Sequence, residues 1–163
     1  MTGNLGAEYM QYWLFKSEPD AFSIDDLAAM PDQTEHWDGI RNYQARNFLR
    51  DQVKLGDQVF FYHSSCKDVG IVGVAEVVRE SYPDHTQFDP ESKYYDPKSD
   101  PDNPRWMMVD IKLKQKFRKI LPLKTIKTMP GIIEIGLVKK GHRLSIMPVT
   151  DIEWQILMDN TEG

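Results

Sequence analysis

The amino-acid sequence predicts an α+β domain, built as a small, bent β-barrel with flanking helices. Short apolar and aromatic runs alternate with helix-type patterns along the 163 residues, and this mixed order is typical of α+β domains. The strand pattern at residues 70–79 is apolar on both faces, as expected of a barrel or of a sheet that is largely covered. No internal repeat or linker divides the chain, whose length suits a single domain.

The first strand and the first helix are expected close to the N-terminus. Residues 12–16 (YWLFK) form an apolar and aromatic run that predicts a strand. Ser23 and Asp26 have the spacing of a capping box. A short helix is therefore expected over 24–30, ending at Pro31.

A loop and a second helix are expected next, at residues 32–39 and 42–53. Four residues of this helix have the i, i+3, i+4, i+7 spacing of a buried face: Ala45, Phe48, Leu49 and Gln52. The opposite surface would carry Asn42, Arg46, Asn47 and Arg50.

Two further strands are predicted at 58–63 and 70–79. The second is apolar on both of its alternating faces, which favours burial on both sides. Gly73 within it indicates a β-bulge or a close approach of another backbone.

Residues 82–104 form an unusually long insert, with five prolines and six acidic residues. Long segments without regular structure tend to be functional or disordered. The aromatic side chains of Phe88, Tyr94 and Tyr95 favour an ordered insert that packs back on the body of the domain.

The C-terminal third is predicted to hold two more strands and two short helices. Residues 105–118 alternate as a long strand, 123–129 suit a short helix, and 143–148 suit a last strand. Thr150 and Glu153 have capping-box spacing for a final helix.

Composition suits a cytoplasmic protein that is not inserted in a membrane. No apolar run approaches the roughly 18–20 residues that cross a bilayer, and the N-terminal residues do not resemble a secretory signal. Cys66 is the only cysteine, which excludes an internal disulfide and fits a reducing compartment.

Charge is distributed unevenly along a chain whose formal net charge is −5. Residues 17–38 contain seven acidic residues and no Lys or Arg, whereas 105–143 contain eleven Lys or Arg and two acidic residues. The basic segment is either a solvated lysine face or a contact surface for a polyanion. An acidic total argues against tight non-specific binding of nucleic acid, because that affinity grows with the number of neutralised phosphates.

No catalytic or metal-binding motif is present in the sequence. The four histidines, His36, His63, His85 and His142, are scattered, and neither His85 with Asp89 nor any other pair has the spacing of a known metal motif, so no metal or other cofactor is expected. His63, Ser64 and Cys66 are close in sequence, but no nucleophile or phosphate-loop signature surrounds them. The chain is therefore not expected to be an enzyme.

A binding pocket made of aromatic and polar side chains remains as the expected functional site. The aromatic candidates lie at strand ends or in loops: Trp13, Trp37, Tyr43, Phe61, Tyr62, Tyr95 and Trp106. Aromatic faces stack on nucleic-acid bases, and Asn or Ser side chains can bind base edges. Trp13 and Phe61 are expected to fill the core instead. Trp37 precedes Asp-Gly in a polar loop, where little apolar burial is expected.

Six segments of the chain closely resemble the EVE domain family, which has nuclear members and many bacterial ones. They are YWLFKSEPDAFSIDDL (12–27), WDGIRNYQARNFLRD (37–51), KLGDQVFFYHSS (54–65), GIVGVAEVV (70–78), RWMMVDIK (105–112) and RLSIMPVT (143–150). The resemblance implies a single domain over 10–160 after a flexible N-terminus of residues 1–9. The short N-terminus lacks a basic extension, so a bacterial, cytoplasmic member is expected.

The resemblance also implies a PUA-like fold and a non-catalytic module that binds a modified base in DNA or RNA, with modified cytosine favoured. PUA-like relatives flip such a base into an aromatic cage. By resemblance, the base pocket would hold Ser17, Glu18, Trp37, Arg41, Asn42, Tyr62, His63, Ser64 and Trp106. Lys16, Arg46 and Arg143 would contact the nucleic-acid backbone.

Two other functions stay open at this stage. The chain could be a protein-interaction module whose basic strands dock an acidic partner, and an unidentified effector protein is a possible partner in either case. It could also be an enzyme acting on nucleobases, in which Glu18 and His63 are the available acid and base.

Overall fold

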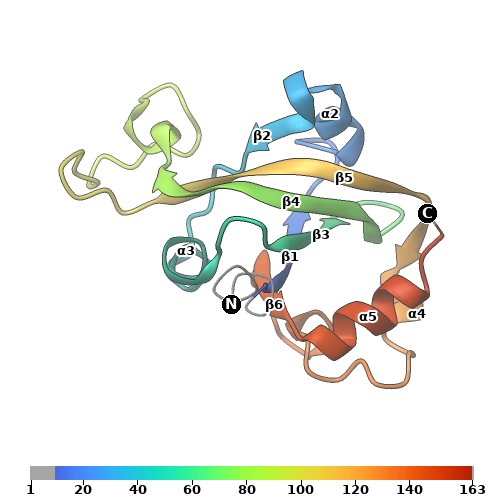
Figure 1. Ribbon diagram of the computed structural model, residues 1–163. Coiled ribbons are helices and arrows are strands. Elements are labelled where there is room, and N and C mark those ends of the chain that lie inside the picture. The colour runs from blue at the N-terminus through green and yellow to red at the C-terminus, as the bar shows by residue number, and fades with distance from the viewer. Residues whose placement is uncertain (1–9, 163) are drawn as a thin grey trace, which may run out of the picture.

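The computed structural model describes residues 10–162, and a mixed six-stranded sheet lies at its centre (Figure 1). The expected flexible segment, residues 1–9, lies outside the described residues. The strands are β1 (Tyr12–Ser17), β2 (Thr34–His36), β3 (Gln58–His63), β4 (Gly70–Pro83), β5 (Met107–Pro122) and β6 (Ile146–Val149). Their order across the sheet is β2-β5-β4-β3-β1-β6. Among these six strands, only β1 and β3 pair in parallel.

The α+β class is confirmed, but the expected barrel is not closed. Within residues 10–162 no hydrogen-bonded ladder joins the edge strands β2 and β6. The sheet is therefore open.

Both faces of the sheet are buried, as the apolar strand patterns predict. Along β1, Trp13 and Phe15 belong to one apolar cluster and Leu14 belongs to the other. This division follows from the side-chain alternation of a strand. The first cluster is covered by α2 (Ile24–Ala29) and α3 (Tyr43–Asn47), and the second by α4 (Leu123–Ile126) and α5 (Asp151–Asp159).

The two predicted N-terminal helices are confirmed, with one change in the second. The capping box of Ser23 and Asp26 is present at the start of α2. Helix α3 continues into the π-helical turn η3 (Phe48–Gln52), in which the Val53 N–H donates to the Phe48 carbonyl at 2.9 Å. The wider π turn rotates the following residues. Val53 is therefore buried in place of Gln52, which is exposed.

The predicted loop at 32–39 contains the short edge strand β2. Its three residues pair antiparallel with Lys112, Ile111 and Asp110 of β5. The Trp37 N–H extends this contact by donating to the Val109 carbonyl at 2.7 Å. The loop prediction was wrong here because the pairing joins segments more than seventy residues apart, which no local pattern reports.

Strands β4 and β5 form a ribbon that is longer than predicted, and the insert lies at one end of it (Figure 1). The prediction at Gly73 is confirmed, because the β4–β5 register shifts there and an added Cβ would collide with the backbone of Gln115. The ribbon therefore bends where a side chain would prevent close packing.

The insert is ordered around Gln87, whose side chain is fully buried. Its Oε1 accepts from the Ser99 hydroxyl at 2.6 Å and from the Trp106 N–H at 3.1 Å, while its Nε2 donates to the Trp106 carbonyl at 2.8 Å. These bonds close the insert into a loop whose two ends meet. The expectation of a packed insert is confirmed, and a short 3₁₀ turn, η4 (His85–Phe88), starts it.

The final helix is capped by Thr150, but the predicted capping box is only half formed. The Thr150 hydroxyl accepts from the Glu153 N–H at 3.1 Å. The Glu153 Oε2 accepts instead from three backbone N–H groups, those of Ile133, Glu134 and Ile135, at 2.8–3.0 Å. Glu153 thereby fixes the segment that leads into the turn η5 (Gly136–Val138).

Candidate nucleic-acid interface

A cavity of about 890 Å³ lies where the parallel strands β1 and β3 end. Ser17 stands beside His63 in the register of these strands, and the Ser64 N–H donates to the Ser17 carbonyl at 2.9 Å. The cavity is lined by Lys16, Ser17, Glu18, Ala21, Phe22, Glu35, His36, Trp37, Asp38, Gly39, Ile40, Ser64, Ser65, Lys93, Tyr94, His142, Arg143 and Ser145. The two strands thus deliver the KSEP and HSS segments to one place.

Six of the twelve candidate site residues line this cavity: Lys16, Ser17, Glu18, Trp37, Ser64 and Arg143. The Ser17 hydroxyl donates to the Phe22 carbonyl at 2.5 Å, so it holds the turn that follows β1. Glu18 is exposed, and within residues 10–162 its carboxylate makes no hydrogen bond or ion pair. Its acceptor oxygens are therefore available to a ligand.

Trp37 is more buried than its polar loop suggests, with 7% of its surface exposed. Its ring packs edge-on against Phe61 at 5.4 Å and tilted against Phe15 at 5.5 Å. The pairing of β2 with β5 turns Trp37 toward the core, which corrects the expectation of little apolar burial. Trp13 and Phe61 lie in the same cluster, so their prediction as core residues is confirmed.

Arg41 lies outside the cavity lining, because its guanidinium holds the insert. Its Nε and Nη2 donate to the Tyr94 carbonyl at 3.0 and 2.8 Å, and its Nη1 donates to the Asp84 carboxylate at 3.0 Å. The side chain of Asp84 is fully buried. A guanidinium with these partners clamps the insert onto the segment that carries Trp37.

Asn42 and Trp106 also lie outside the cavity lining. Asn42 caps α3 by accepting from the Ala45 N–H at 3.0 Å. The Trp106 ring stacks on Tyr43 at 4.8 Å and donates from Nε1 to Asp96 at 2.7 Å. Both residues therefore support the helix and the insert.

Tyr62, His63 and Arg46 complete the set that the cavity does not include. His63 lies under α2, where its Nε2 accepts from the Ile24 N–H at 3.1 Å and burial lowers its pKa. Tyr62 follows Phe61 in β3, so strand alternation sends its ring to the opposite face. Arg46 donates to the Arg105 carbonyl at 2.8 Å.

The residues that sequence reasoning missed come from the loop after β2, the insert and the segment before β6. Tyr94 lines the cavity because Gly39 has a φ of +82° and an added Cβ would strike its ring. Asp38 also lines it, and burial is the largest influence raising the pKa of its carboxyl group. Only the long aromatic-containing insert in the sequence hinted at such a contribution.

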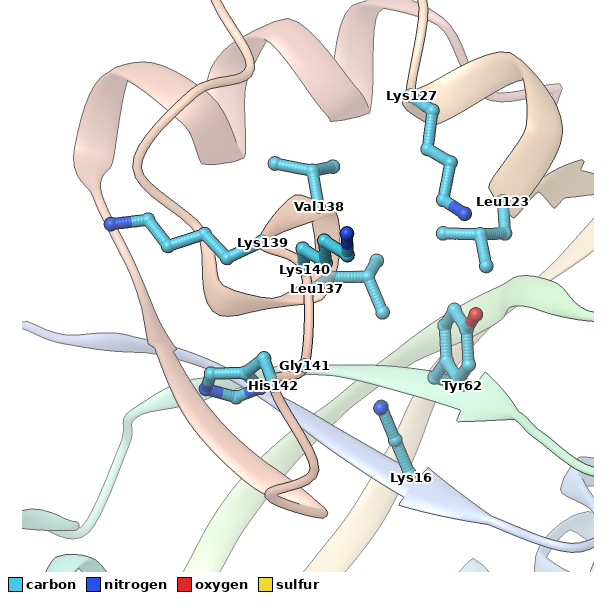
Figure 2. A pocket seen from close by; sticks show the side chains of 10 residues that line it. All are labelled: Lys16, Tyr62, Leu123, Lys127, Leu137, Val138, Lys139, Lys140, Gly141 and His142. Atoms are coloured by element: carbon cyan, nitrogen blue, oxygen red, sulfur yellow. The ribbon is translucent and has the colours of Figure 1, made fainter.

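A second cavity of about 670 Å³ adjoins the first and is basic (Figure 2). Lys16 and His142 line both cavities. Its other lining residues are Tyr62, Leu123, Lys127, Leu137, Val138, Lys139, Lys140 and Gly141, with no acidic residue among them. Figure 2 shows Lys16 and Lys127 entering the space beside Tyr62 and Leu123, whereas Lys139 extends away. Burial lowers the pKa of Lys16 and raises that of Tyr62 to about 12.

The basic segment 105–143 divides into a paired part and an unpaired part. On β5, Lys112 pairs with Asp32 at 3.1 Å, Lys114 with Glu76 at 3.3 Å, and Lys116 and Lys119 with Asp25 and Glu162. In the part of the chain that the structure describes, none of the four lysines of the second cavity forms an ion pair. Lys127, Lys139 and Lys140 therefore bring unpaired positive charge to the second cavity.

Residues 11–160 match the family described as the EVE domain. This chain belongs to the EVE domain family. It is 43% identical to mouse thymocyte nuclear protein 1, over 98% of this chain and 77% of that protein.

Solved structures of relatives agree with this EVE domain over nearly its whole length. A crystal structure from Pseudomonas putida is 49% identical with a TM-score of 0.87, covering 91% of this chain and 97% of that one. Human THYN1 protein in complex with 5-methylcytosine-containing DNA is 43% identical with a TM-score of 0.86, covering 94% and 99%. Among residues 10–162 of this EVE domain, no helix is long and apolar enough to cross a membrane.

Proposed function

We propose that this EVE domain is a non-catalytic module that binds nucleic acid carrying a modified base, with modified cytosine in DNA favoured. The observation that carries the proposal is the human relative, which was solved with 5-methylcytosine-containing DNA and is similar over 94% of this chain. The proposal includes a PUA-like mode of binding, in which the base is flipped out of its strand into the larger cavity. A volume of about 890 Å³ lies within the range of pockets that enclose small ligands.

The lining of the larger cavity suits a cytosine-type base. The exposed edge of Trp37, together with Phe22 and Tyr94, offers apolar and aromatic surface for stacking, at roughly 1–3 kcal/mol per base. The Glu18 carboxylate accepts hydrogen bonds and can receive the exocyclic amino group of cytosine. A carbonyl oxygen at that position, as in thymine, would place two hydrogen-bond acceptors against each other, which is unfavourable.

The second cavity supplies the contact with the strand that carries the base. Because Lys16 and His142 line both cavities, a base in the first would place its neighbouring phosphates beside Lys127 and Lys140 of the second. Phosphate contacts from lysine position a strand without reading its sequence. An acidic chain can therefore bind nucleic acid locally, through a small unpaired group of lysines.

The protein-interaction alternative has less support, because the β5 lysines that would dock an acidic partner already pair with acids of this chain. The nucleobase-acting enzyme also has less support. His63, its candidate base, accepts a hydrogen bond from the backbone of α2 and does not line the cavity.

The base-binding proposal is tested by titration with fluorescent oligonucleotides that carry cytosine or 5-methylcytosine, as single strands, duplexes and RNA. We expect strands with 5-methylcytosine to bind about tenfold or more tightly than strands with cytosine. We expect Glu18→Gln to weaken the binding of both about tenfold, because both bases carry the amino group that Glu18 receives. Equal affinity for modified and unmodified strands would overturn the proposal.

The choice of variants follows from burial. Trp37→Ala would cost about 3–5 kcal/mol of folding free energy, which would confound any loss of binding. Trp37→Phe keeps most of the apolar volume and changes the surface that faces the base. Glu91→Gln, on an exposed residue of the insert outside both cavity linings, is the matched control for Glu18→Gln.

If the second cavity binds phosphates, removing its lysines should change how nucleic-acid affinity depends on salt concentration. Lys127→Gln combined with Lys140→Gln should make the slope of log K against log salt shallower by about 1–2, because each phosphate contact contributes about 0.7–0.9. Lys114→Gln combined with Lys116→Gln is the control and should leave the slope nearly unchanged, since both lysines are already paired on β5. If the control pair alters the slope and the cavity pair does not, the phosphates follow β5 instead.

A further inference from the structure

The fold brings together two histidines and an aspartate from segments that are distant in sequence. His36 ends β2, Asp38 follows in the same loop, and His85 is the first residue of η4. Each residue offers one ligand atom, and these three atoms all lie within 4.8 Å of one another. The two imidazole rings are nearly perpendicular, with centroids 5.0 Å apart. Imidazole and carboxylate are ligands that zinc takes readily.

The distances suit a tetrahedral ion. With bonds of about 2.0–2.2 Å, two ligand atoms on zinc lie about 3.3–3.6 Å apart. The His36 Nε2 lies 3.5 Å from the Asp38 carboxylate. His85 is exposed, so a small rotation of its side chain can complete the set. Asp38 and His36 therefore already have the spacing that the ion requires.

A neighbouring carboxylate orients the first ligand. The His36 Nδ1 lies 2.9 Å from the Glu35 carboxylate, which leaves Nε2 as the coordinating nitrogen. Metal-binding histidines usually engage a carboxylate or carbonyl through the second ring nitrogen, which fixes the tautomer and the ring orientation.

The backbone that carries the ligands is held in place without an ion. His36 is fixed by the pairing of β2 with β5. Asp38 and His85 are joined through their neighbours, because the Gly39 N–H donates to the buried Asp84 carboxylate at 2.8 Å. Arg41 balances Asp84, so Glu35 and Asp38 leave the cluster with excess negative charge. The geometry is thus largely set before an ion arrives.

We propose that His36, Asp38 and His85 bind one divalent cation of the zinc type, with a fourth coordination position left open. Because His36 and Asp38 also line the larger cavity, the ion lies at its wall. It links the Trp37 segment to the insert, and its open position is available to an oxygen or nitrogen of a bound ligand. This inference does not depend on nucleic-acid binding.

The test is a calorimetric titration with zinc chloride and no nucleic acid, with free zinc set by a competing chelator. We expect one ion per wild-type chain and at least about tenfold weaker binding by His85→Ala, because one of three ligands is lost. His85 is exposed, so this variant should fold, and circular dichroism checks that it does. Glu91→Gln, on an exposed residue of the same insert outside both cavity linings, is the control and should bind zinc as the wild type does.

A second readout identifies the coordination. Cobalt should give the visible absorption of a four-coordinate ion in the wild type, and His36→Gln should abolish it. Magnesium should not compete, because it prefers oxygen ligands. The proposal is overturned if the wild type binds no zinc, or if His85→Ala and His36→Gln bind it with wild-type affinity.

Discussion

Asp84→Ala is expected to lower the free energy of unfolding by about 3–5 kcal/mol, because it removes one partner of a buried ion pair. The fully buried Asp84 side chain accepts from the Gly39 N–H, from Arg41 and from the Thr86 N–H at 2.8–3.0 Å. The Gly39 and Thr86 N–H groups would lose this acceptor and Arg41 would lose its charged partner, so the attachment of the insert to the Trp37 segment would weaken. Urea denaturation measures the loss. Asp102→Ala, on an exposed residue of the same insert, should change the stability by less than about 0.5 kcal/mol.

The stabilisation that the Asp84 carboxylate provides should disappear in acid. Burial alone would raise the pKa of Asp84, but hydrogen bonds from Thr86, Gly39 and Arg41 outweigh it and lower that pKa. A carboxyl group with a lowered folded-state pKa stabilises the fold above its unfolded pKa, and this stabilisation is lost as the pH falls through the folded pKa. The wild type and Asp84→Ala should therefore converge in stability below about pH 4. A constant difference from pH 7 to pH 2 would contradict the role given to this carboxylate.

Glu153→Ala should lower the free energy of unfolding by about 3 kcal/mol, because charge-assisted hydrogen bonds contribute about 1.5–3 kcal/mol each and the loop relaxes in part. Glu153 is 2% exposed, and its Oε2 accepts from three successive N–H groups. For a domain of this size the melting temperature should fall by roughly 6–12 °C. Glu153→Gln keeps one acceptor oxygen, so it should lower the free energy of unfolding by about half as much as Glu153→Ala.

A control variant and a binding measurement test whether the effect of Glu153→Ala comes from its three hydrogen bonds. Gln155→Ala, on the exposed face of the same helix, should leave the melting temperature almost unchanged. Glu153 fixes the segment that precedes Lys139 and Lys140. Glu153→Ala should therefore also weaken the binding of nucleic acid at the second cavity. If Glu153→Ala lowers the melting temperature by less than about 2 °C, the three N–H groups find water or other acceptors at little cost.

The elements that the sequence predicted correctly are those whose signal is local. The capping box of α2 and the alternation of β1, β3 and β4 involve neighbours within a few residues. Strand β2 was missed because it has three polar residues and exists only by pairing with β5. The π turn was missed because it changes which residues are buried without changing the helical pattern before it.

Half of the candidate site residues line the larger cavity for the same reason. Strand ends are local, and the parallel register then places Ser17 and Ser64 together. Nothing in the segment around Arg41 reveals its contact with Tyr94, a partner 53 residues away. The two charged segments were treated as separate surfaces, yet they neutralise each other where Asp25 meets Lys116 and Asp32 meets Lys112.

The open sheet has a consequence for how concentrated solutions of the chain behave. An unpaired sheet edge is a template on which a second chain can add a strand and begin to aggregate. Here the edge at β2 is only three residues long, and the edge at β6 carries Pro148, which has no N–H to donate. Within residues 10–162 neither edge strand offers a long run of free donors and acceptors, so β2 and β6 are poor templates for a strand from a second molecule.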